Sequence, residues 1–171
     1  MKKLLMTFVV AIAAVTLAGC GQKSEMDKLR ESAEKGDAKA QFELGKCYSE
    51  GKGINKDAAE AAKWYRKAAE QGYAGAQYIY GRCCLDGTGI AKNSSEGLKW
   101  LLKAANQGNV NAVYDAGVCY CDGIGVKRNI DMALKYFVLA EKAGHPKCKN
   151  KAYEEKLTAA TLEENGLNFK F

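Results

Sequence analysis

The sequence contains only one proline and only one histidine, the neighbours Pro146 and His145. A single proline, together with no strand-like alternation of polar and apolar residues, predicts an all-α fold. A single histidine excludes a histidine cluster for zinc and any catalytic site built from several histidines. His145 falls in a loop between two expected helices, where a surface or capping role is favoured over catalysis.

Two further absences narrow the function. Glycine pairs such as Gly51 and Gly53 have neither the following Lys-Ser/Thr nor the preceding strand of a phosphate-binding loop, so helix termination explains them better. The 26 Lys and Arg residues outnumber the 20 Asp and Glu residues only modestly and are interspersed with them, so no run indicates a nucleic-acid partner. No catalytic Ser/His/Asp arrangement can be proposed. We therefore expect no enzyme, no metal site and no cofactor.

The longest apolar segment, Leu4 to Leu17, is shorter than the roughly 20 residues that span a bilayer. It follows Lys2 and Lys3, as the core of a secretory signal does. The sequence Leu-Ala-Gly-Cys that ends at Cys20 resembles the bacterial lipoprotein cleavage box. The resemblance implies that residues 1–19 are removed and that lipid on Cys20 anchors the chain permanently.

The alternative to lipidation is an ordinary signal peptide followed by a chance cysteine. Small residues beside Cys20, directly after the apolar core, favour the lipoprotein interpretation. Gly21 rather than Asp follows the cysteine, which in a Gram-negative host implies the periplasmic side of the outer membrane. The segment 20–24 would then be a short tether.

Self-comparison reveals repeats with a period of 36 residues. The three full units are 40–75, 76–111 and 112–147, preceded by a half-repeat at 25–39 and followed by a capping helix and tail at 148–171. Glycines recur in four columns: Gly45, Gly81 and Gly117; Gly51, Gly87 and Gly123; Gly53, Gly89 and Gly125; Gly72, Gly108 and Gly144.

Each unit is predicted to be a helical hairpin with a first helix A and a second helix B. Gly51 and Gly53 end helix A of the first unit, because glycine adopts positive φ at little cost. Asp57, Asn93 and Asn129 are expected N-caps of helix B, with Glu60 and Glu96 placed as in a capping box. One hairpin cannot bury both faces, so the units must stack into a solenoid.

The first unit reads Ala40-Gln41-Phe42-x-Leu44-Gly45-x-x-Tyr48-x-x-Gly51-x-Gly53-Ile54, then Ala61-x-x-Trp64-Tyr65-x-Lys67-Ala68-Ala69-Glu70-Gln71-Gly72. This pattern resembles the Sel-one-like repeat, a relative of the tetratricopeptide repeat, and it covers nearly the whole mature chain. The resemblance implies a curved α/α superhelix that binds other proteins through its concave, helix A side. Four residues depart from the pattern and are expected to thin the core: Tyr80, Cys84, Gly97 and Ala116. Gly97 inside helix B should cost up to about 1 kcal/mol relative to alanine.

Six cysteines besides Cys20 would lie in a compartment where disulfides persist. The column Cys47, Cys83 and Cys119 occupies equivalent positions on successive A helices, too far apart for a bridge. Cys83 and Cys121 differ by about 200° around the helix, so they are the expected bridged pair. The alternative, favoured for that column, is that its cysteines are small buried apolar side chains.

Partner contacts are expected on helix A. The aromatic column Phe42, Tyr78 and Tyr114 could contact a partner or belong to the core. Acidic residues end each helix A, namely Glu50, Asp86 and Asp122, and basic residues precede each helix B, namely Lys56, Lys92 and Arg128. Both placements oppose the helix dipole, so helix stability does not explain them. We expect either that the acid and the base pair across each loop, or that they form charged ladders that select a partner.

Together these features predict a membrane-anchored adaptor of the bacterial cell envelope that binds a protein or peptide. The alternative is a peptidoglycan- or β-lactam-binding protein or an envelope enzyme, because relatives of this repeat are linked to peptidoglycan turnover. The missing catalytic residues argue against the enzyme.

Overall fold

The computed structural model describes residues 24–149, and within that range every regular element is a helix. The predicted all-α solenoid of helical hairpins is therefore confirmed. The signal segment 1–19, Cys20 and the rest of the tether up to residue 23, and the tail 150–171 lie outside the described residues. The helices are α2 (Glu25–Glu34), α3 (Ala38–Glu50), α4 (Ala58–Glu70), α5 (Ala74–Asp86), α6 (Ser94–Asn106), α7 (Val110–Asp122), α8 (Ile130–Lys142) and α9 (Pro146–Lys149).

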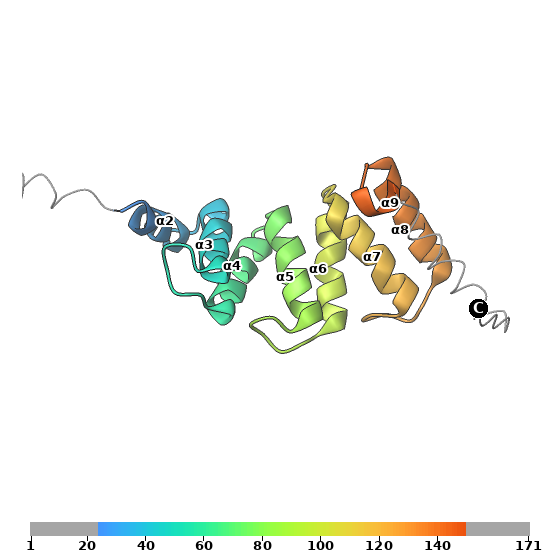
Figure 1. Ribbon diagram of the computed structural model, residues 1–171, viewed down its shortest axis with the longest axis horizontal. Helices are drawn as coiled ribbons and strands as arrows, with labels where there is room; N and C mark the ends of the chain where they lie inside the picture. Colours follow the sequence, from blue (N-terminus) through green and yellow to red (C-terminus); the bar gives the residue numbers. More distant parts are fainter. Residues whose placement is uncertain (1–23, 150–171) are drawn as a thin grey trace, which may run out of the picture.

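The helices follow one another in chain order along one elongated array (Figure 1). Pairs α3/α4, α5/α6 and α7/α8 form three hairpins in which every helix has 13 residues. Helix α2 precedes them as an unpaired B helix, and α9 begins where a fourth A helix would begin. No helix within 24–149 is long and apolar enough to cross a membrane.

Polar caps begin the B helices as predicted. Asp57, Asn93 and Asn129 each accept hydrogen bonds from backbone N–H groups in the first turn of α4, α6 and α8. The capping box itself forms elsewhere, between Ser24 and Asp27 at the start of α2. The Glu60 carboxylate instead pairs with Lys63, so its predicted reciprocal bond is wrong.

The second glycine of the loops in the second and third repeats has a role that positive φ alone does not explain. A Cβ placed on Gly89 would lie 2.0 Å from the carbonyl oxygen of Ala58, the first residue of α4. A Cβ on Gly125 would lie 2.2 Å from the carbonyl oxygen of Ser94, the first residue of α6. Each of these loops therefore lies directly against the start of helix B in the preceding repeat, in a space that admits only glycine.

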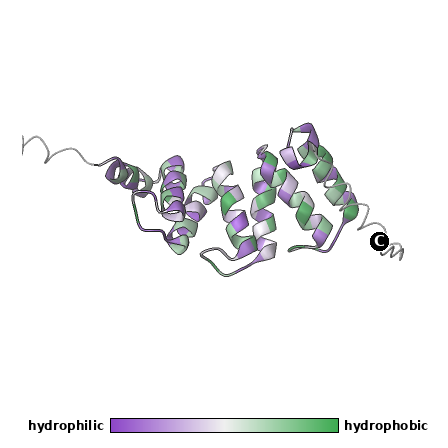
Figure 2. Ribbon diagram, viewed as in Figure 1, coloured by the Kyte–Doolittle hydropathy of each residue, from purple (hydrophilic) through white to green (hydrophobic). Residues whose placement is uncertain are grey.

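Every helix contains both apolar and polar residues (Figure 2), and the apolar residues recur at helical spacing, so each helix has a side that can be buried. The core contains many alanines and a few large side chains, of which Leu44, Leu101 and Phe137 are fully buried. Tyr80, one of the departures from the repeat pattern, packs its ring edge-on against Trp100 at 5.6 Å between centroids.

Gly97 is not the weak point that its helix propensity predicts. A Cβ there would lie 2.9 Å from the carbonyl oxygen of Gly81 and 2.7 Å from Cδ2 of Leu85. The missing side chain thus lets α5 and α6 approach closely. Glycine is less favourable than alanine in an isolated helix. In α6, however, the alanine side chain would collide with the neighbouring helix α5.

Candidate functional site

The A helices α3, α5 and α7 carry equivalent stripes of side chains, which together form what we call the A-helix face. Each stripe has residues four apart, and this spacing places them on one side of the helix. The order along each stripe is aromatic, then variable, then acidic: Phe42, Lys46 and Glu50; Tyr78, Arg82 and Asp86; Tyr114, Val118 and Asp122. The predicted aromatic and acidic contact residues therefore lie on the same face.

Two grooves open on this face, one on each side of α5. The first groove, between α3 and α5, has a volume of about 390 Å³ and is lined by Phe42, Lys46, Ser49, Glu50, Tyr65, Ile79, Arg82, Cys83, Asp86 and Thr88. The second groove, between α5 and α7, has a volume of about 410 Å³ and is lined by Arg82, Leu85, Asp86, Lys92, Tyr114, Asp115, Val118, Cys119, Ile124 and Lys147. Arg82 and Asp86 line both grooves, so these two side chains of α5 stand at the boundary between them.

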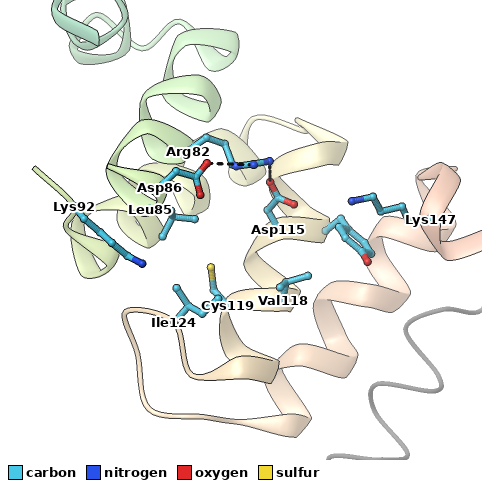
Figure 3. A pocket seen from close by; sticks show the side chains of 10 residues that line it. Arg82, Leu85, Asp86, Lys92, Asp115, Val118, Cys119, Ile124 and Lys147 are labelled. Carbon is cyan, nitrogen blue, oxygen red and sulfur yellow. Dashed lines mark hydrogen bonds and ion pairs between the residues drawn. The ribbon is translucent and has the colours of Figure 1, made fainter. Parts of the chain in front are cut away.

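Arg82 connects the second and third repeats across the second groove. Its guanidinium donates to Oδ2 of Asp86 on its own helix at 3.3 Å and to Oδ2 of Asp115 on α7 at 3.3 Å (Figure 3). Asp86 is thus paired within α5, while Lys92 makes no bond to it. The predicted pairing across the loop is therefore wrong for this repeat, because a cation one turn earlier on the helix is better placed.

The three aromatic residues have different environments. Tyr114 is only 9% exposed and stacks on His145 at 4.3 Å between ring centroids, so it belongs to the core. Phe42 is half-buried and packs against Tyr73 at 5.1 Å. His145 and Tyr73 both occupy the position just before an A helix, so an aromatic ring covers the first and third members of the column.

Tyr78 lacks such a cover, because the equivalent position holds Asn109, whose side chain caps α7. Tyr78 is half-buried. Burial raises the pKa of its hydroxyl, and the Asp115 carboxylate raises it further, while a hydrogen bond with Arg82 opposes the shift. Tyr78 therefore lies beside the ion pairs of the second groove, and its contact with a partner stays a prediction, as do those of Phe42, Glu50 and Asp122.

The structure does not bring Cys83 and Cys121 together, and neither is in a disulfide. Cys83 packs toward α4, in a cluster with Ala61 and Tyr65, whereas Cys121 packs toward α8, in a cluster with Ala133 and Phe137. The two positions are indeed on opposite sides of their helices, but each points away from the other. The expected bridge is therefore absent because the direction of stacking is the reverse of the one it needs.

The column Cys47, Cys83 and Cys119 consists mainly of buried cysteines, as the alternative interpretation predicted. Cys83 and Cys119 are buried, and Cys47 is half-buried. Burial raises the pKa of the Cys83 thiol to about 11 and that of the Cys119 thiol to about 11. These thiols are thus protonated at neutral pH and unsuited to nucleophilic chemistry.

A repeated glutamine clasp was not anticipated from the sequence. Buried Gln41 donates to the carbonyl oxygen of Ala33 at 3.0 Å, and its own side-chain oxygen accepts from Gln71 at 2.7 Å. Gln77 repeats the arrangement with Ala69 and Gln107. The recurrence of both glutamines at the repeat period was the available signal. The third repeat has Val113 and Ala143 at these positions, so its clasp is missing.

His145 is buried rather than at the surface, with 5% exposure, and its Nδ1 makes no hydrogen bond within the described residues. Burial lowers the pKa of its imidazole. Within 24–149 no group of three or more His, Cys, Asp and Glu side chains could hold a metal ion.

A family model for the Sel1 repeat matches residues 38–73, 74–109 and 110–145, and so most of the chain. The chain belongs to the Sel1 repeat family. Sel1 repeat proteins generally mediate protein–protein interactions and are typically non-enzymatic scaffolds.

Individual relatives are bacterial. A 69-residue segment is 38% identical to the secretory immunoglobulin A-binding protein EsiB of Escherichia coli O6:H1 strain CFT073, and covers 39% of this chain and 14% of EsiB. The crystal structure of c5321, a protective antigen of uropathogenic E. coli with an SLR fold, is similar with a TM-score of 0.68 and 38% identity, over 72% of this chain and 26% of that one.

Two other solved structures extend the comparison. A Sel1 repeat protein from Oxalobacter formigenes has a TM-score of 0.68 and 42% identity, over 70% of this chain and 49% of that one. Helicobacter pylori cysteine-rich protein B has a TM-score of 0.57 and 21% identity, over 76% of this chain and 98% of that one, a likeness of fold alone. The chain spans less than half the length of EsiB, c5321 and the Oxalobacter protein, so their partners do not transfer to it.

Proposed function

We propose that this chain is a lipid-anchored scaffold of the bacterial cell envelope that holds a protein or peptide along its A-helix face. One observation carries the proposal: two grooves open on this face, one on each side of α5, and together they are lined by residues of α3, α5 and α7. A ligand lying along this face would contact every repeat at once. Family membership supports binding of a protein rather than catalysis.

The anchor rests on the sequence around Cys20. The described residues begin at Ser24, which caps α2 through a reciprocal bond with Asp27. Four residue steps separate Cys20 from this cap, and a fully extended chain covers about 14 Å over that distance. A lipid on Cys20 would therefore hold the solenoid close to its own membrane, on the periplasmic side of the outer membrane in a Gram-negative host.

The binding proposal can be tested with two arginine substitutions, each at a position where the other repeats already have a basic residue. Val118→Arg places a cation where Lys46 and Arg82 stand in the other repeats, and it fills the second groove. Leu139→Arg changes an exposed residue of α8 where the other repeats have Lys67 and Lys103. Both variants should fold, because each adopts the chemistry of an equivalent position.

Affinity capture from envelope extracts, read by quantitative mass spectrometry, should recover partners with wild type and Leu139→Arg but lose them with Val118→Arg. Equal recovery by the two variants would argue against the A-helix face. The anchor is tested separately: radiolabelled palmitate should label the wild type and not Cys20→Ser, and globomycin should block processing. Unlabelled wild type would refute lipidation.

A further inference from the structure

The two grooves differ in whether their cations already form ion pairs. In the first groove, Lys46 pairs with Glu43 and Arg82 pairs with Asp86, so both cations are engaged. In the second groove, Arg82 alone engages both carboxylates, Asp86 and Asp115. Arg82 therefore bridges both carboxylates, and with Lys92 and Lys147 the groove lining holds three cations against two carboxylates.

Neither Lys92 nor Lys147 forms an ion pair with another residue of 24–149. Lys92 comes from the loop between α5 and α6, and Lys147 comes from α9. Figure 3 shows them on opposite sides of the second groove, each with its nitrogen directed toward the middle. Nζ of Lys147 lies 5.3 Å from the ring centroid of Tyr114, which holds the ammonium on this side of α9.

Between the two lysines the groove has a small apolar floor, which lies beside the ion pairs of Arg82 with Asp86 and Asp115. Leu85 on α5, Val118 and Cys119 on α7 and Ile124 in the following loop line it. Positive charge at both ends of an apolar floor is complementary to a segment with negative charge at both ends of an apolar middle. The same arrangement disfavours a basic segment, because like charges in an interface cost free energy and suppress wrong partners.

We propose that the second groove binds an extended acidic peptide segment in which two carboxylates flank apolar side chains. The apolar side chains pack on Leu85 and Val118, and the carboxylates pair with Lys92 and Lys147. This inference rests on the proposed function and names the partner's chemistry. It also assigns different roles to the two grooves: the second selects by charge, while the first, with its engaged cations, adds apolar contact.

The probe is a fluorescein-labelled peptide, Gly-Ser-Asp-Leu-Val-Leu-Asp-Ser-Gly, titrated by anisotropy against the full-length lipidated protein in nanodiscs. A matched peptide carries Lys in place of both Asp residues. The charge-reversed protein is Lys92→Glu/Lys147→Glu. Its control, Lys135→Glu/Lys142→Glu, makes the same change in net charge on exposed positions of α8.

We expect the acidic peptide to bind wild type and control alike, and to bind the charge-reversed protein about tenfold or more weakly. The lysine peptide should show the opposite preference, and added salt should weaken acidic binding because it screens the rim charges. No binding of the acidic peptide, or equal affinity for both proteins, overturns the inference. If captured partners are lost with Val118→Arg but kept with the charge-reversed protein, the binding face stands and the acidic-segment proposal falls.

Discussion

Replacing Gly89 by alanine should be far more damaging than replacing another positive-φ glycine of the same solenoid. Gly89 has φ of +73°, and its Cβ would lie 2.0 Å from the oxygen and 2.4 Å from the carbon of the Ala58 carbonyl. Gly108 has φ of +81° and would meet nothing within 4 Å. The two substitutions therefore share the backbone cost and differ in the contact.

The magnitudes follow from these two terms. A left-handed conformation costs an L-residue about 1–2 kcal/mol, which applies to both variants. Overpacking adds about 1–3 kcal/mol and occasionally more, and it applies only to Gly89→Ala. We thus expect the free energy of unfolding to fall by about 1–2 kcal/mol for Gly108→Ala and by about 2–5 kcal/mol for Gly89→Ala.

Urea unfolding followed by far-ultraviolet circular dichroism measures both losses. Gly125→Ala is a second test, because its Cβ would lie 2.2 Å from the carbonyl oxygen of Ser94. It should behave as Gly89→Ala does. Equal destabilisation by Gly89→Ala and Gly108→Ala would refute the argument that the loop needs glycine for contact between repeats.

Three other outcomes follow from the packing. Gly97→Ala should lower the urea midpoint even though alanine favours helices, since its Cβ meets the Gly81 carbonyl at 2.9 Å; a raised midpoint would contradict the close approach of α5 and α6. Because burial lowers the pKa of His145, the unfolded chain binds more protons than the folded one as pH falls below about 6.5, so stability should drop there in the wild type and less in His145→Phe. Identical pH profiles of thermal melting would refute this. Finally, non-reducing peptide mapping should find no bond between Cys83 and Cys121, because Cys83 packs toward α4 and Cys121 packs toward α8; a bond between them would contradict this packing.

The fold could be predicted because it repeats. Glycines recurring at one period and polar caps at one phase mark every helix end, so local chemistry alone defines the hairpins, and Asp57, Asn93 and Asn129 cap α4, α6 and α8 as expected. Stacking follows from the apolar side that a single hairpin leaves uncovered.

Predictions that depend on direction or distance between helices were less successful. The angle between Cys83 and Cys121 on their helices was inferred correctly, but periodicity does not tell which side of a helix faces the preceding repeat. Gly97 looked like a defect because helix propensity takes no account of the neighbouring helix. Proximity in sequence predicts an ion pair between Asp86 and Lys92, whereas Asp86 pairs with Arg82, one turn away on the same helix.

The candidate site could likewise be predicted only in part. The columns that contain Phe42, Tyr78 and Tyr114 could be aligned from the repeat period, and they do share one face. Their different burial depends on the residue that precedes the next A helix, Tyr73, Asn109 or His145, which covers one ring and leaves another uncovered. Such a dependence between repeats cannot be read from one column alone.

Photo-crosslinking in intact cells tests the binding face most directly. p-Benzoylphenylalanine would replace Ile79 in the first groove and Val118 in the second, with Lys99 and Leu139 on the B helices as controls. Crosslinked partners would be identified by mass spectrometry. We predict that Ile79 and Val118 yield the same partner and that the controls yield none of it. The same partner captured from Lys99 or Leu139, and not from the grooves, would contradict the account.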